Sequence, residues 1–241
     1  MRATSIIYRR ELGTYLRSPY GWVIASIVLL IVGLLFQGYA MSGEMLSAYV
    51  LERYFYVASG IPLFGGVLLS FRLLSEERQN HSMVLLNTSP IRDSEIVVGK
   101  FLAALTFLAI MLVLSIYLPI LIKVNGKITW SQILVGYVGM LLVGGATLAI
   151  GLFASAMTRQ QLIAAVVAAA MVLVLCFIHL LANKVDPPLK EVIEQLDLWW
   201  VHYQYGFMKG VLNLKDVVYY VAATYFFLLL SIKTLEAKRW Q

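Results

Sequence analysis

The sequence has little charge. Asp, Glu, Lys and Arg make up only 13% of its 241 residues, whereas 61% of the residues are hydrophobic. A soluble domain of this length needs a larger share of charged side chains to cover its surface. The composition therefore excludes a soluble globular domain and predicts an all-α integral membrane protein.

Several kinds of chemistry are missing as well. The single cysteine, Cys176, stands in an apolar run, which excludes a disulfide framework and a metal site built on cysteines. No G-x-x-x-x-G-K-[ST] motif is present, because Gly99-Lys100 and Gly126-Lys127 both lack the upstream glycine and the following Ser or Thr. There is also no HExxH motif and no Ser/His/Asp constellation at membrane depth. We therefore expect a chain that is not an enzyme, has no metal site and binds no ATP through a P-loop of its own.

Acidic residues are absent from the interiors of the long apolar segments. Ion-coupled secondary transporters need carboxylates within the membrane, so this absence weighs against that class. We expect His179 to be an interfacial histidine that is hydrogen-bonded to a neighbour, with a ligand or a proton relay as the alternative. His81 and His202 fall on opposite sides of the membrane in the topology below, which excludes a site made of all three histidines.

Six segments have the length that a membrane helix requires, or nearly so, since a bilayer core of about 30 Å takes about 20 apolar residues. They are residues 21–41, 54–74, 101–122, 130–157, 162–182 and 217–233. We expect them to form a single transmembrane domain over residues 1–241. Glycines in the second and fourth segments and alanines in the fifth permit close helix packing, mainly within the chain, with a share in a homodimer seam as the alternative.

The basic residues predict the orientation of the chain. With the N-terminus in the cytoplasm, the cytoplasmic segments contain 12 Lys and Arg residues and the opposite segments contain 7. The cytoplasmic segments in this count are residues 1–20, 72–100, 158–161 and 233–241. The positive-inside rule then favours both termini in the cytoplasm. The net charge of +6 is interpreted in the same way, as membrane flanks rather than as a surface for nucleic acid.

The N-terminal residues 1–19 separate into two arcs on a helical wheel. The apolar arc contains Tyr8, Leu12, Tyr15 and Leu16, and the basic arc contains Arg2, Arg9, Arg10 and Arg17. This separation predicts an amphipathic helix in the membrane–water interface. The alternative is a basic tail that acts only in setting the topology.

Residues 75–100 are expected to form a cytoplasmic coupling hairpin. The second span continues as a helix to Arg78, and a short apolar helix follows at 82–88 and ends before Pro90. A solvated loop does not need the Met-Val-Leu-Leu run at 83–86, so we expect a partner protein to cover it, with lipid headgroups as the alternative.

Residues 183–216, between the fifth and sixth spans, are expected on the extracytoplasmic side. Two prolines are followed by a helical pattern and by five aromatic residues from Trp199 to Phe207. Aromatic residues concentrate at headgroup depth, so the segment predicts a surface-lying or re-entrant helical hairpin.

Four stretches, in order along the chain, resemble the ABC-2 type permeases, and most closely their gliding-motility-type branch. The stretches are "RRELGTYLRSPYGW" at the entry to the first span, "RLLSEERQNHSMVLLNTSPIRDSEIVVGKFLAAL" around the second and third spans, "LFASAMTRQQLIAAVVAA" between the fourth and fifth spans, and "GVLNLKDVVYYV…LEAKRW" at the last helix. The second stretch contains the RLL-x-EE, LL-x-T-SP and V-x-GKF elements of the family. Together the four stretches cover nearly the whole chain.

The resemblance implies a permease subunit of an ATP-driven ABC transporter, with export as the family's usual direction. Such a subunit forms a translocation path with a second permease copy, either identical or a paralogue, and binds two copies of a cytoplasmic ABC ATPase. ATP and Mg²⁺ would bind to that ATPase, so no cofactor is expected on this chain. Relatives in this branch also associate with an auxiliary membrane protein that has an extracytoplasmic domain. The implied location is the bacterial inner membrane, among membrane lipids and without nucleic acid.

The resemblance also implies roles for individual residues. The ATPase-coupling residues would be Glu76, Glu77, Arg78, Met83, Val84, Leu85, Leu86, Ser89 and Pro90, and the interface helix would act through Arg9, Arg10, Glu11, Leu12 and Arg17. The charged residues at 76–78 would anchor the hairpin through pairs with the ATPase or with Arg9, Arg10 or Arg17. Residues that bind substrate do not carry over.

Two other functions are alternatives. One is a membrane scaffold or lipid-modifying enzyme without ATP coupling, which the absence of a catalytic cluster disfavours. The other is a stand-alone channel, which the absence of a charged ring or a selectivity-filter-like loop disfavours.

Overall fold

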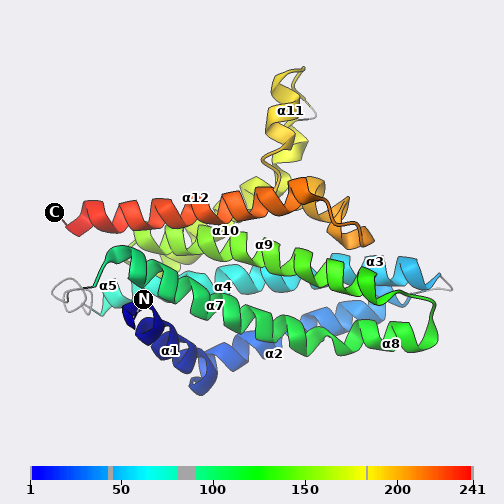
Figure 1. Cartoon of the computed structure of the whole chain (residues 1–241), viewed down its shortest axis with the longest axis horizontal. Coiled ribbons are helices and arrows are strands. Elements are labelled where there is room, and N and C mark those ends of the chain that lie inside the picture. The colour runs from blue at the N-terminus through cyan, green and yellow to red at the C-terminus, as the bar shows by residue number, and fades with distance from the viewer. Residues whose placement is uncertain (1, 43–45, 81–90, 183, 240–241) are drawn as a thin grey trace.

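Long apolar helices dominate the computed structural model, which describes residues 2–42, 46–80, 91–182 and 184–239. No strand occurs among these residues. Figure 1 shows the long helices lying side by side along one axis, with both chain termini at the same end. The elements are α1 (Arg2–Arg17), α2 (Pro19–Leu35), η1 (Phe36–Ala40), α3 (Ser47–Ala58), η2 (Ile61–Gly65), α4 (Gly66–Ser70), α5 (Arg72–Gln79), α7 (Asp93–Ser115), α8 (Tyr117–Asn125), α9 (Trp130–Met157), α10 (Gln161–Ala182), α11 (Leu189–Glu194), η3 (Trp200–Gln204), η4 (Phe207–Lys209) and α12 (Leu214–Arg239).

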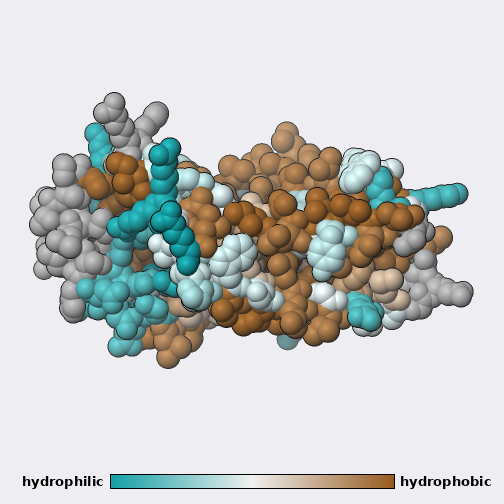
Figure 2. All heavy atoms as spheres, turned by 90° about the horizontal axis from the view of Figure 1, so that it is seen from below, coloured by the Kyte–Doolittle hydropathy of each residue, from teal (hydrophilic) through white to brown (hydrophobic). Residues whose placement is uncertain are grey.

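Six helical stretches in the described residues are long and apolar enough to cross a membrane. They are Pro19–Ala40, Ser47–Gln79, Asp93–Val124, Trp130–Met157, Gln161–Ala182 and Leu214–Lys238. For the described residues, the prediction of a helical protein with six helices suited to spanning a membrane is confirmed. Figure 2 shows an apolar band along the middle of the bundle and hydrophilic residues gathered at the end that carries α1, which we call the terminal end.

Helix α9 lies at the centre of the bundle. It packs against α12, α10, α4 and α7, and every residue from 143 to 152 is buried. A helix that is apolar on all sides must be buried on all sides or face lipid. The glycines of this span allow its burial on all sides. A Cβ at Gly144 would overlap Leu108, and a Cβ at Gly151 would overlap Ser70.

The second span, Ser47–Gln79, is irregular, and hydroxyl groups from α9 compensate for its irregularities. Proline has no N–H and disturbs the helix around Pro62, whose carbonyl accepts a hydrogen bond from Thr147 Oγ1 at 2.8 Å. One turn after the break between α4 and α5, Ser155 Oγ accepts from the backbone N–H groups of Leu74 and Ser75 at 3.0 and 2.9 Å. In lipid a backbone group without a partner costs several kcal/mol, so these bonds make the interrupted span compatible with the membrane.

A third polar contact within the bundle links α3, α7 and α9. The Tyr54 hydroxyl lies 2.7 Å from the Tyr137 hydroxyl and 3.2 Å from Ser115 Oγ. Ser115 is the last residue of α7, where the third span changes direction into α8. The three hydroxyls satisfy one another, so no water is needed at this depth.

Helix α1 packs against α7 and buries a stripe that recurs every four residues. Ile7 and Tyr15 are buried, and Glu11 lies between them on the same side, with 14% of its side chain exposed. The helical wheel identified Tyr15 on the apolar arc and omitted Ile7. The close approach depends on Gly99, since a Cβ there would lie 3.0 Å from Ile7 Cγ2. A charged residue on the buried stripe of α1 therefore faces the start of α7.

The segment between α10 and α12 returns to the bundle at the end opposite the terminal end. Figure 1 shows α11 projecting from the bundle; α11 packs against α10, and the residues after it pack against α3, α9 and α12. Tyr203 donates to the carbonyl of Phe55 at 3.2 Å, Trp199 Nε1 donates to Ser59 Oγ at 3.0 Å, and Tyr220 donates to the carbonyl of Leu198 at 2.8 Å. We call residues 184–213 the return hairpin. It contains the short helices α11, η3 and η4, while the predicted helical hairpin and its side of the membrane stay predictions.

The contact between α4 and α9 can be tested at Gly66. A Cβ at this position would overlap Thr147 Oγ1, whereas a Cβ at Gly33 meets no atom within 4 Å. We expect Gly66→Ala to displace Thr147 from the Pro62 carbonyl and to destabilise the protein by about 1–3 kcal/mol. Gly33→Ala, the matched control in another helix, should be neutral or slightly stabilising because alanine is the better helix former. Thermal unfolding in detergent measures both, and equal midpoints for the two variants would contradict the packing.

Candidate functional site

The predicted coupling residues divide between described and undescribed parts of the chain. Glu76, Glu77 and Arg78 lie in the last two turns of α5, and the predicted interface residues lie on α1. Met83, Val84, Leu85, Leu86, Ser89 and Pro90 lie outside the described residues. The candidate site is therefore built from the described residues that flank this segment on α5 and α7, together with α1.

Four charged side chains from three helices meet at this place. Lys100 Nζ of α7 lies 3.0 Å from Glu11 Oε1 of α1 and 3.0 Å from Glu77 Oε1 of α5. Arg10 Nη2 lies 2.7 Å from the same oxygen of Glu11 and 2.8 Å from the same oxygen of Glu77. We call Arg10, Glu11, Glu77 and Lys100 the Lys100 cluster. It joins α1, α5 and α7 in one closed set of ion pairs.

Because Lys100 is buried, its two ion pairs contribute more to stability than the two ion pairs of Arg10. Lys100 is only 2% exposed, and the side chains of Glu11 and Glu77 are 14% and 12% exposed, whereas Arg10 is 55% exposed. A buried ammonium without partners would be costly, so both carboxylates are needed to compensate for the lost water. The exposed Arg10 contributes less because water screens its charge.

The Lys100 cluster also changes the acidity of Glu11. Burial alone would raise the pKa of the carboxyl, but the charges and hydrogen bonds of Lys100 and Arg10 outweigh it and lower the pKa of Glu11. Glu11 therefore stays ionised over the whole physiological range. Its contribution to stability is present above the ordinary glutamate pKa and is lost as the pH falls through the lowered value.

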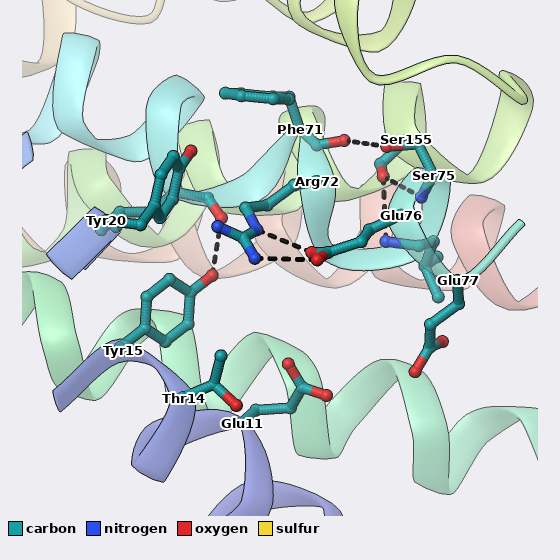
Figure 3. Close-up of polar contacts among 12 residues, drawn as sticks. Glu11, Thr14, Tyr15, Tyr20, Phe71, Arg72, Ser75, Glu76, Glu77 and Ser155 are labelled. Carbon is teal, nitrogen blue, oxygen red and sulfur yellow. Dashed lines mark hydrogen bonds and ion pairs between the residues drawn. The ribbon is translucent and has the colours of Figure 1, made fainter. Parts of the chain in front are cut away.

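A second charged pair lies beside the Lys100 cluster. Arg72 Nε and Nη2 donate to the two carboxylate oxygens of Glu76 at 2.7 and 2.9 Å, and the guanidinium lies 4.1 Å from the centre of the Tyr20 ring (Figure 3). The Tyr15 hydroxyl donates to the carbonyl of Leu69 at 2.7 Å. These contacts fix the base of α5 against α1 and the start of α2. A cavity of about 280 Å³ separates this pair from the Lys100 cluster, with Arg10, Glu11, Arg72, Glu76 and Lys100 in its wall.

The remaining predicted residues have different surroundings. Arg78 donates to the carbonyls of Ala156 and Thr158 at the end of α9. Leu12 packs against the apolar core. Arg9 and Arg17 are exposed, and neither forms an ion pair with a described residue. Of the three arginines proposed as partners for residues 76–78, the structure pairs Arg10 with Glu77.

Sequence reasoning missed Lys100 as the partner of Glu11 and Glu77. The GKF element carries the resemblance to the family, and the structure gives each of its three residues a separate structural role. Gly99 lets α1 approach, Lys100 forms the buried ion pairs, and Phe101 is buried. Glu11 and Lys100 are 89 positions apart, so no local periodicity could reveal the pair.

Two histidine–aspartate pairs fix the return hairpin. His179 Nδ1 lies 2.9 Å from Asp197 Oδ2, and His202 Nδ1 lies 2.7 Å from Asp216 Oδ1. The expectation that His179 is hydrogen-bonded to a neighbour is confirmed, while both aspartates were missed as partners. Asp197 Oδ1 also accepts the backbone N–H groups of Trp199, Trp200 and Val201 at 2.5–3.2 Å. Each buried charge is thus satisfied by partners from the hairpin or the adjacent helix.

No three His, Cys, Asp or Glu side chains of the described residues gather closely enough to hold a metal ion.

Residues 5–233 match the family described as ABC-2 family transporter protein. The match spans nearly the whole chain and includes every charged residue of the Lys100 cluster. Comparison with curated proteins finds no significant match.

Replacement of Lys100 by methionine tests the buried ion pairs. Lys100→Met leaves two carboxylates largely buried with only the exposed Arg10 as a partner, so we expect a loss of about 3–5 kcal/mol in stability. Arg10→Gln removes the exposed partner from the same two carboxylates and should cost no more than about 1 kcal/mol. Thermal unfolding in detergent measures both variants. An effect of Arg10→Gln as large as that of Lys100→Met would contradict the assigned roles.

The acidity of Glu11 gives a second test of the same cluster. Because Glu11 is ionised near neutral pH, the stability gap between the wild type and Lys100→Met should be large at pH 7. The gap should narrow as the pH falls below the ordinary glutamate value of 4.5, since the protonated Glu11 carboxyl no longer needs the ammonium. Thermal midpoints of both proteins over this range measure the gap. A gap independent of pH would show that Lys100 acts through packing alone.

Proposed function

The chain belongs to the ABC-2 family of transporter proteins, and we propose that it is the membrane-spanning permease subunit of an ATP-driven exporter. The absence of a P-loop from the sequence supports an energy source on a separate ATPase chain. We propose two copies of that cytoplasmic ATPase and two copies of the permease in the complex.

The Lys100 cluster is the observation that carries this proposal. The segment that we assign to ATPase binding, residues 81–90, is flanked by α5 and α7. These two helices are joined to each other and to α1 by the ion pairs of Lys100 with Glu77 and Glu11. A displacement applied between α5 and α7 therefore reaches α1 as well. The three helices would then move as one rigid unit when the ATPase moves.

The contacts of α5 connect this rigid unit to the other membrane-spanning helices. Ser155 of α9 accepts the N–H groups of Leu74 and Ser75, and Arg78 binds the carbonyl end of the same helix. Helix α9 is the central helix and packs against α10 and α12. Closure of two ATPases would thus tilt the spans as packed bodies and alternate the access to a path between two permease copies.

The distribution of arginines supports an orientation of the protein in the membrane. We place the terminal end in the cytoplasm, in a bacterial inner membrane, because nine of the ten arginines of the sequence lie in segments assigned to that side. This orientation puts the Lys100 cluster within reach of a cytoplasmic ATPase and puts the return hairpin on the extracytoplasmic side.

We propose that the second permease copy covers the groove between the second and fifth spans. This groove has a volume of about 580 Å³ and an almost entirely apolar wall that includes Phe64, Val67, Val166 and Leu173. The exposed side chains of Leu173 and Phe177, in the later turns of α10, belong to the same surface. A second copy is the simplest partner that the resemblance offers for such a surface.

Purification from the native host tests the coupling role. We expect the tagged wild type, extracted in mild detergent, to retain a protein that contains a G-x-x-x-x-G-K-[ST] motif and hydrolyses ATP. Leu86→Asp should abolish this association, because a charge in the Met-Val-Leu-Leu run opposes burial in a partner. Leu212→Asp, a matched change of an exposed leucine in the return hairpin, should leave the association unchanged.

The alternatives predict other results. A scaffold or lipid-modifying enzyme without ATP coupling would be purified as a homo-oligomer with full activity and without the ATPase. Association that survives Leu86→Asp would remove residues 83–86 from the docking surface and leave the family assignment intact.

A further inference from the structure

Two basic side chains, from α5 and α12, bind the carbonyl groups of the last turn of α9, and a third basic residue stands in the turn that follows α9. Arg78 of α5 donates to the carbonyl of Ala156. Lys238 of α12 donates to the carbonyls of Ala156 and Met157 at 3.1 and 2.7 Å. Arg159, two positions after Met157, lies close enough for its positive charge to repel both of the others. We call Arg78, Arg159 and Lys238 the α9 cation cluster.

The charge of this cluster is not balanced within the described residues. No described carboxylate forms an ion pair with Arg78, Arg159 or Lys238. The carbonyl end of α9 compensates only about half of one elementary charge. Three cations held together in this way leave a strongly positive site, and an anion would relieve their mutual repulsion.

The position of the cluster relates it to the membrane surface. Helix α9 ends at Met157 and α10 begins at Gln161, so Arg159 stands in the turn between two spans. The neighbouring apolar side chains Met157, Leu162 and Ile163 are 49%, 77% and 48% exposed. Exposed apolar surface next to basic residues at a helix end is typical of the boundary between acyl chains and headgroups.

Donors for an anion are available at this boundary. Arg159 and Lys238 are exposed and Arg78 is partly buried, so the cluster is open to the surroundings. A guanidinium has five N–H donors, and the bonds of Arg78 to carbonyl oxygens use only Nη1. The first turn of α10, which starts two residues after Arg159, adds backbone N–H groups that have no acceptor within the helix.

We propose that the α9 cation cluster binds the phosphate of an anionic phospholipid, whose acyl chains lie against the first turns of α10. A headgroup phosphate matches both features, since it supplies negative charge to the cluster and hydrocarbon to Leu162 and Ile163. An acidic segment of a partner protein would satisfy the charge and leave this apolar surface without a function. The α9 cation cluster shares no residue with the Lys100 cluster.

Lipid titration of the purified full-length protein tests the site. We expect phosphatidylglycerol to raise the thermal midpoint in detergent and to stay bound in native mass spectrometry, and phosphatidylcholine to do neither. The variant Arg159→Gln/Lys238→Gln leaves Arg78 in place to cap α9. Its affinity for phosphatidylglycerol should fall about thirtyfold, as expected when two basic residues near a membrane surface are removed.

A variant with the same net charge is the control. Arg9→Gln/Lys233→Gln removes two exposed cations from the terminal end without touching the α9 cation cluster, and Lys233 forms its ion pair with Glu236. Its affinity should stay within about threefold of the wild type, because neither residue belongs to the α9 cation cluster and salt screens the attraction of exposed charges elsewhere.

Three results would overturn the proposal. Equal loss of affinity in the two double variants would mean that net charge alone attracts the lipid. Stabilisation by inorganic phosphate at the same concentration, as strong as that by phosphatidylglycerol, would mean a site for free anions. Unchanged lipid affinity in Arg159→Gln/Lys238→Gln, together with loss of the associated ATPase, would assign the cluster to an acidic protein surface.

Discussion

The buried ammonium of Lys100 constrains the terminal end of this protein more than any other single group. It needs carboxylates from two other helices, and it obtains them from Glu11 and Glu77. Both carboxylates come within reach only if α1 packs closely on α7 at Gly99 and if α5 extends beyond the core of its span. The position of α1, the length of α5 and the start of α7 are therefore consequences of one ion-pair arrangement. Because the pairs are largely buried, they hold these helices in a fixed geometry.

The spans could be predicted because lipid imposes a length and an apolar composition. The segments predicted at 130–157 and 162–182 correspond to α9 (Trp130–Met157) and α10 (Gln161–Ala182) almost residue for residue. The second span is longer than hydropathy indicated, since Ser47–Gln79 includes polar turns at both ends. Its interruption near Pro62 was visible in the sequence, but the hydroxyl groups of α9 that compensate for it were not. Such contacts depend on which helix is adjacent, and composition alone does not determine adjacency.

The candidate site was predictable only in part. The charges at 76–78 were expected to bind partners, and Arg10 was among the arginines considered for that role. Lys100 was not considered, because a lysine at a span entry has an ordinary explanation in the positive-inside rule. Asp197 and Asp216 were overlooked for a similar reason, since acidic residues in a connecting segment are usually solvated. Their burial follows from the return of that segment to the bundle, which the sequence indicated only as one of two alternatives, a re-entrant rather than a surface-lying hairpin.

The helix from Ser47 to Gln79 has a further consequence for how the two faces of the membrane communicate. Its 33 residues correspond to a length of about 50 Å, enough to pass through the whole bilayer. At one end it carries Glu77, and near the other it offers the Phe55 carbonyl and Ser59 hydroxyl that hold the return hairpin. This span therefore connects the Lys100 cluster to the return hairpin within one continuous segment of the chain. Because η2, α4 and α5 all pack against α9, the contacts at the two ends of this span are connected through the central helix of the bundle.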